Sequence, residues 1–190
     1  MNVLKAARAR IAWIFSKFDH VYVAFSGGKD SGVLVNLVYD YLRGEGNGKR
    51  ATIVFIDLEG CYRRTVEFAE RLMLDNRDIA EPMWICLPMR SPNSVSMHEP
   101  WWTFWDPAKR ERWVRPMPQG AHVITSENNP FGDFWHDDIT FEDFIEHFGD
   151  WLSDREGCAV AGLVGIRTQE SLNRWRAIWR DDKGMFEDCR

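Results

Sequence analysis

The sequence is short of cysteine and tyrosine and has no long hydrophobic run. Its four cysteines form no C-x-x-C pair, so neither a zinc ribbon nor an iron–sulfur cradle is indicated. No apolar stretch approaches the roughly 20 residues that cross a bilayer, and the short apolar run at residues 11–15 is followed by no small-residue cleavage site. We therefore expect a cytoplasmic protein without membrane contact, zinc or an iron–sulfur cluster. Its thiols are interpreted as buried or incidental: Cys61, Cys86, Cys158 and Cys189.

Several catalytic motifs are also missing from the sequence. It has no G-x-x-x-x-G-K-[ST] loop, no G-x-G-x-x-G turn and no G-x-S-x-G elbow. These absences argue against a Walker A nucleotidase, a dinucleotide-binding dehydrogenase and a serine hydrolase. The five histidines show no H-E-x-x-H or other ligand spacing, so a metal site built from them is not expected.

Tryptophan, in contrast, is abundant, with 10 Trp beside 12 Phe in 190 residues. So many large apolar side chains exclude a disordered chain, and the length suits one core, so we predict a single domain over residues 1–190. The net charge is −5. Residues 127–156 contain ten acidic residues and one basic residue, Arg155, so the remainder of the chain has a net charge of +4. This balance does not suit a general DNA-coating protein, although one basic cleft could hold a polyphosphate.

Strand and helix patterns alternate along the chain. The predicted strands are almost continuously hydrophobic, which indicates a parallel sheet that is covered by helices on both faces. Together with the alternation, this predicts an α/β doubly wound fold of the Rossmann-like type. Between Arg90 and His136 the periodicity fails, and five of the tryptophans fall there. We interpret residues 90–138 as a Trp/Pro-rich insertion that is functional, packed by its own aromatics, or partly regular structure that the pattern does not reveal. The predicted strands are 21–25, 52–56, 83–87 and 159–164, and the predicted helices are 1–18, 33–42, 66–73, 140–152 and one after residue 167.

The first predicted strand ends at a glycine turn, Ser26-Gly27-Gly28-Lys29-Asp30-Ser31, which leads into a helix. Glycines let the backbone approach a ligand closely, and the free N–H groups of a helix N-terminus favour an anion. The serine hydroxyls can donate to phosphate oxygens, Lys29 adds a cation, and Asp30 can cap the helix or hold Mg²⁺. Because ligands of parallel sheets bind beyond the carboxyl ends of the strands, this turn is expected to converge with residues 57–64 and 165–174.

The turn resembles the PP-loop, S-G-G-x-D-S, of the ATP pyrophosphatase and phosphoadenosine phosphosulfate (PAPS) reductase superfamily. Residues 165–174 resemble the G-x-R-x-x-E-S-x-x-R element of PAPS reductases and ATP sulfurylase small subunits. Over nearly the whole chain, residues 101–107, 113–118 and 163–174 resemble the phage- and prophage-borne immunoglobulin-binding regulator A type of PAPS reductase-like proteins. The resemblance implies an adenine nucleotide α-hydrolase-like (HUP) fold.

The resemblance also implies a role for individual residues. The PP-loop residues Ser26, Gly27, Gly28, Lys29, Asp30 and Ser31 would hold the β,γ-pyrophosphate of ATP, or the corresponding groups of PAPS. Asp57 and Glu59 would lie beside adenosine, although Asp57-Leu58-Glu59 departs from the D-T-G of the reductases. Arg167 and Arg174 would face the anionic groups together with Gly165 and Ser171, and Glu170 would position one of these arginines. Lys29, Asp30, Arg167 and Arg174 are the predicted catalytic residues, with Asp30 as the metal ligand.

Three functions follow from the resemblance. The favoured one is cleavage of Mg-ATP at the α-phosphate, an adenylyl transfer. A PAPS reductase or sulfotransferase is the alternative enzyme, but the reductase nucleophile lies in an E-C-G-L-H segment that this sequence lacks, since Cys189 stands in Asp188-Cys189-Arg190. The third is a nucleotide-responsive binding module that acts with a ParB-like nuclease.

A basic strip interleaves with two tryptophans, which could stack nucleic-acid bases. It consists of Lys109, Arg110, Arg112 and Arg115, beside Trp105 and Trp113. We favour the interpretation that these tryptophans pack the insertion onto the sheet while the charges face water. A contact with nucleic acid is therefore the less favoured prediction.

Overall fold

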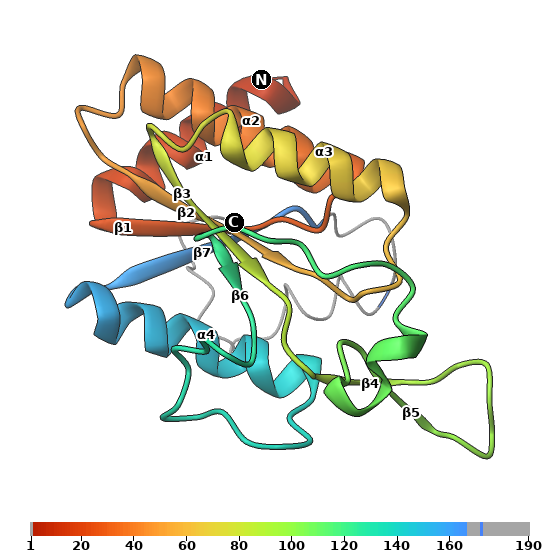
Figure 1. Cartoon of the computed structure of the whole chain (residues 1–190). Helices are drawn as coiled ribbons and strands as arrows, with labels where there is room; N and C mark the ends of the chain where they lie inside the picture. Colours follow the sequence, from red (N-terminus) through yellow and green to blue (C-terminus); the bar gives the residue numbers. More distant parts are fainter. Residues whose placement is uncertain (1, 167–171, 173–190) are drawn as a thin grey trace.

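The computed structural model describes residues 2–166 and residue 172. Its centre is a five-stranded, fully parallel sheet with the strand order β6-β3-β2-β1-β7 (Figure 1). The predicted α/β doubly wound, Rossmann-like fold is thereby confirmed. The five strands are β1 His20–Ala24, β2 Ala51–Ile56, β3 Ala80–Ile85, β6 Val123–Ile124 and β7 Val160–Val164.

Helices cover both faces of this sheet. Figure 1 shows α1 (Val3–Lys17), α2 (Lys29–Gly44) and α3 (Arg63–Leu74) on one face and α4 (Phe141–Glu156) on the other. Each helix turns an apolar stripe inward, as Val35, Val38 and Leu42 of α2 do. The strand β2 is buried along almost its whole length because it lies between two layers of helices.

The insertion is less irregular than the sequence indicates. It contains β6, which pairs in parallel with β3, and an antiparallel hairpin of β4 (Arg90–Pro92) and β5 (Trp101–Thr103). A 3₁₀ helix, Pro107–Arg112, follows the hairpin. Of the interpretations of residues 90–138, partly regular structure that the pattern does not reveal is thereby confirmed, because a strand of two residues is too short to show a period.

One predicted strand is shifted along the chain, and one predicted helix lies outside the described residues. The third strand is Ala80–Ile85 and begins three residues before the predicted 83–87, since Pro82 in its first half conceals it from a strand pattern. The predicted last helix lies outside the described residues. The remaining strands and helices lie at the predicted places.

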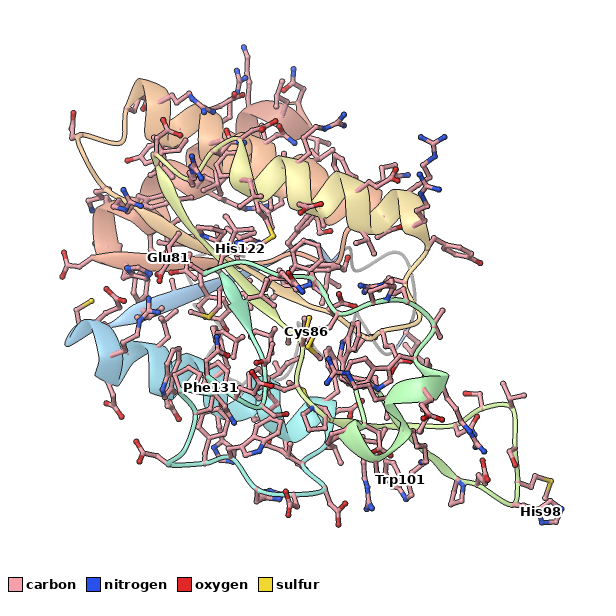
Figure 2. The ribbon with its side chains drawn as sticks, viewed as in Figure 1. Glu81, Cys86, His98, Trp101, His122 and Phe131 are labelled. Carbon is pink, nitrogen blue, oxygen red and sulfur yellow. The ribbon has the colours of Figure 1, made fainter. Side chains whose placement is uncertain are left out.

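Aromatic side chains fill the layer between the sheet and α4. Phe131 comes from the insertion and is fully buried on the α4 side of the sheet (Figure 2). Its ring packs edge to face against Phe144, with centroids 5.0 Å apart, and against Trp151, with centroids 4.5 Å apart. Part of the aromatic excess therefore fixes the insertion to α4.

Truncation of Phe131 to alanine should lower the free energy of unfolding by about 3–5 kcal/mol, because it leaves a cavity among rings that cannot collapse. Urea unfolding followed by circular dichroism measures the change. The exposed Val95→Ala substitution serves as the control and should change the free energy by less than about 0.5 kcal/mol. Equal effects of the two substitutions would contradict the described packing.

Candidate functional site at the carboxyl ends of the strands

The strand order reverses between β1 and β7. From β1 the chain proceeds through α2 to β2 and on to β3, whereas β7 lies on the other side of β1. In open α/β sheets such a switch point leaves a crevice beyond the carboxyl ends of the two strands, where ligands bind. The glycine turn follows β1 and Gly165 follows β7, so both sequence motifs begin at the switch point.

The glycine turn is held together by its two serines. The hydroxyl oxygens of Ser26 and Ser31 lie 3.0 Å apart, and the Ser31 hydroxyl also donates to the carbonyl oxygen of Gly28 at 3.1 Å. The Ser26 N–H donates to the Ser31 hydroxyl oxygen at 3.2 Å. These hydrogen bonds fix the backbone where it enters α2. The turn is thus held by hydrogen bonds among its own residues.

Gly27 cannot be replaced by a larger residue without a shift in the structure. Its φ is +73°, and a Cβ atom at this position would lie 2.4 Å from Cγ2 of Thr65 in α3. Gly28 is the N-cap of α2 and provides no side-chain acceptor for the helix N–H groups. The start of α2 therefore offers backbone donors and a positive dipole end, which suit an anion.

Lys29 and Asp30 form the first turn of α2. The Lys29 side chain is 80% exposed and its Nζ lies 4.0 Å from Oδ1 of Asp30, whose side chain is one-third exposed. No group of three or more His, Cys, Asp or Glu side chains in the described part of the chain could hold a metal ion. A single carboxylate still fits Mg²⁺ when substrate phosphates complete the shell. The position of Asp30 is thus compatible with its predicted role as the Mg²⁺ ligand.

Gly165 brings the end of β7 against the start of α2. A Cβ atom at residue 165 would lie 2.9 Å from both the Cα and the N atom of Ser31. The first residue of the second predicted motif, Gly165, therefore packs directly against the backbone of Ser31 in the first motif. The other predicted residues of the second motif lie outside the described residues, namely Arg167, Glu170, Ser171 and Arg174.

Asp57 and Glu59, predicted beside adenosine, lie at the end of β2 and are buried. Asp57 accepts hydrogen bonds from Nε1 of Trp84 at 2.8 Å, from the Glu59 N–H at 2.9 Å and from Nη2 of Arg115. The carboxylate of Glu59 accepts from the N–H groups of Trp105 at 2.7 Å and Val114 at 3.0 Å. In this structure both carboxylates bind the insertion.

Arg115 is the residue of this site that the sequence analysis did not identify. Its guanidinium pairs with the fully buried Asp57 and lies over the ring of Trp105, 4.9 Å from the centroid. Nε1 of Trp105 in turn donates to the carbonyl oxygen of Asp57 at 2.7 Å. The sequence places Arg115 in a basic strip, and no local spacing connects it with an aspartate 58 positions away.

The two tryptophans of the basic strip pack inward. Trp105 is 1% exposed, and Trp113 lies edge to face against it with centroids 5.2 Å apart. Lys109, Arg110 and Arg112 are exposed on the 3₁₀ helix. Trp105 therefore has no open face on which a base could stack.

The cysteines near the site are not activated. Sγ of Cys86 lies 3.8 Å from Oδ2 of Asp57, and burial, reinforced by this carboxylate, raises the pKa of the thiol far above neutrality. Burial also raises the pKa of Cys61. Because the thiolate is the nucleophile, the raised pKa disfavours both thiols as nucleophiles.

The fold and the strand-end turn place the protein in the class of Rossmann-like α/β proteins. The chain is homologous to the uncharacterized protein YbdN of Escherichia coli (strain K12), with 37% identity over 189 residues. This match covers 99% of the chain but only 44% of YbdN, so the chain spans less than half the length of that relative. No known family model matches the chain. None of the described helices is both long and apolar enough to span a membrane.

The Asp57→Ala substitution should lower the free energy of unfolding by about 3–5 kcal/mol, because it leaves Arg115 without its counter-charge in a nearly buried position. Urea unfolding measures this loss. The double variant Asp57→Ala/Arg115→Met, which removes both charges, should be less destabilised than the single variant. The exposed Asp154→Ala substitution is the control. A double variant as unstable as the single one would contradict the pairing.

Proposed function

We propose that the protein binds ATP with Mg²⁺ at residues 26–31 and transfers its adenylyl group to an acceptor with release of pyrophosphate. The supporting observation is a hydrogen-bonded glycine turn at the N-terminus of α2, placed at the switch point of the sheet and touched by Gly165. The resemblance of this turn to the PP-loop supports the choice of nucleotide. ATP pyrophosphatases of that superfamily cleave at the α-phosphate.

Binding of the pyrophosphate group would use the start of α2. The N–H groups of the first helical turn and the ammonium of Lys29 are suitable donors. The hydroxyl proton of Ser31 is already used in the hydrogen bond to the carbonyl oxygen of Gly28. The exposed Lys29 can follow the phosphates without desolvation of a buried charge. Arg167 and Arg174 enter this proposal through the resemblance alone, as groups that face the phosphates from the β7 side.

In the reaction an oxygen or sulfur atom of the acceptor forms a bond to the α-phosphorus. The bond from that phosphorus to the α,β-bridging oxygen breaks, and pyrophosphate leaves with the electron pair. Lys29 and the helix N–H groups would stabilise the charge that builds up on pyrophosphate. Mg²⁺, held by Asp30 and the phosphates, would supply further charge neutralisation.

The thiols of Cys61 and Cys86, near the strand ends, are poor candidates for the nucleophile of PAPS reduction. A reductase needs a thiolate that attacks the sulfonate, and the raised pKa of Cys61 and Cys86 keeps both thiols protonated. Sulfotransfer to another acceptor would still use the same anion site. Product analysis separates the two reactions.

The experiment incubates the protein with Mg-ATP and, separately, with PAPS and a thiol donor, and identifies products by chromatography. Pyrophosphate with AMP or an adenylylated acceptor supports the proposal, whereas sulfite with adenosine bisphosphate supports the reductase. A nucleotide that raises the melting temperature without turnover supports a nucleotide-responsive binding module. At 100 times its dissociation constant a ligand adds about 2.7 kcal/mol of stability, so binding itself is measurable.

Lys29→Ala should weaken ATP binding roughly tenfold, since it removes one charge-assisted contact, and Asp30→Ala should abolish the Mg²⁺ dependence of binding. Isothermal titration calorimetry measures both effects. Lys5→Ala on α1 is the matched control, because Lys5 is equally exposed and lies away from the strand ends. Unchanged ATP binding in both loop variants would contradict the site.

A further inference from the structure

A groove of about 790 Å³ lies within the insertion. One wall comes from the 3₁₀ helix and residues 113–118, and the other from residues 123–128. Its volume lies within the range of small-molecule sites. The predicted PP-loop residues do not line it, so the groove and the proposed nucleotide site share no residues.

Arg115 provides a fixed cation in this groove. Its side chain is 16% exposed, and in the described part of the chain all its hydrogen bonds run from Nη2 to Asp57. Its Nε is buried without a hydrogen-bond partner among the described residues. This buried Nε does not reach a ligand, but Nη1 makes no hydrogen bond within the described residues, while Asp57 and the Trp105 ring hold the guanidinium plane in place.

Arg110 adds a second guanidinium to the same groove. It lies over the ring of Trp113, 5.5 Å from the centroid, and Nε1 of Trp113 donates to the carbonyl oxygen of Asp106 at 2.9 Å. The ring is therefore oriented by a hydrogen bond and in turn orients an exposed arginine. Both arginines line the same groove.

The remaining lining is neutral or apolar, with one acid. Met117 and neighbouring prolines give an apolar surface, and Thr125 and Asn128 are fixed by a hydrogen bond of 2.6 Å from the Thr125 N–H to Oδ1 of Asn128. Glu127 also lines the groove. The charged lining residues Arg110, Arg115 and Glu127 carry one net positive charge, and Asp57 behind Arg115 offsets it, so the groove does not suit a polyanion.

We propose that this groove binds a small carboxylic acid with a flat apolar body, whose carboxylate is held by Arg115 and Arg110. Planar guanidinium groups can donate paired hydrogen bonds to a carboxylate. The Trp113 ring and the apolar surface beside it can pack against the flat apolar part of the ligand. The site is assigned from its lining alone and does not require a nucleotide.

The same carboxylic acid would be the acceptor in the proposed adenylyl transfer. This step rests on the proposed function. Arg115 is bonded to Asp57 at the end of β2, and β2 pairs with β1, which leads into the glycine turn. An ionised carboxylate oxygen can form the bond to the α-phosphorus while pyrophosphate leaves with the electron pair. No proton is transferred in this step, so no general base is needed.

The test uses protein labelled with 5-fluorotryptophan and follows the ¹⁹F resonance of Trp113, assigned through the Trp113→Phe variant. Phenylacetate should shift this resonance in a saturable manner without nucleotide. Phenylacetamide, which has the same shape without the charge, should bind at least about tenfold more weakly. No saturable shift, or equal affinity for the two compounds, would overturn the proposal.

Arg110→Gln should weaken phenylacetate binding by about tenfold, whereas Arg112→Gln, on the same exposed 3₁₀ helix but outside this groove, should not. Equal effects of the two substitutions would overturn the site. Lys29→Ala should leave phenylacetate binding unchanged, and a loss in this variant would place the anion in the PP-loop instead. Failure of ATP binding with intact phenylacetate binding would refute the proposed function alone.

Discussion

Two buried carboxylates at the end of β2 determine how the insertion joins the sheet. Asp57 pairs with Arg115, and Glu59 accepts two backbone N–H groups of the insertion. A buried charge is costly without partners, so these contacts must form for the fold to be stable. Glu59 and Trp105, which are hydrogen-bonded to each other, both have left-handed backbone conformations. Such strain persists only where surrounding contacts impose it.

This constraint divides the strand-end edge into two parts. At β2 and β3 the insertion binds the sheet, and its outer side, with Arg110 and Arg115, forms the groove. At β1 the glycine turn and Gly165 define the switch point. The groups that a ligand can bind there are backbone N–H donors rather than buried charges. The proposed function assigns the nucleotide to the second part, and the further inference assigns a carboxylate acceptor to the first.

Most of the fold could be predicted from the sequence, since buried parallel strands and amphipathic helices have strong periods, as β2 and α2 do. The strand β6 could not, because two residues show no period. The turn at Ser26–Ser31 was recognisable because glycines and a helix start are local signals. The Asp57–Arg115 pair was not, because a contact between residues 58 positions apart leaves no local pattern. The part of the predicted site after residue 166, including Arg167, remains a prediction.

The central claim is that the start of α2, at the switch point, receives the phosphates of an adenine nucleotide. Amide hydrogen exchange measured with and without Mg-ATP tests it most directly, because it resolves where the ligand orders the backbone. The account predicts slower exchange at residues 27–32 and at Gly165, with little change at residues 119–128. Unchanged exchange at residues 27–32, or protection confined to the groove, would contradict it.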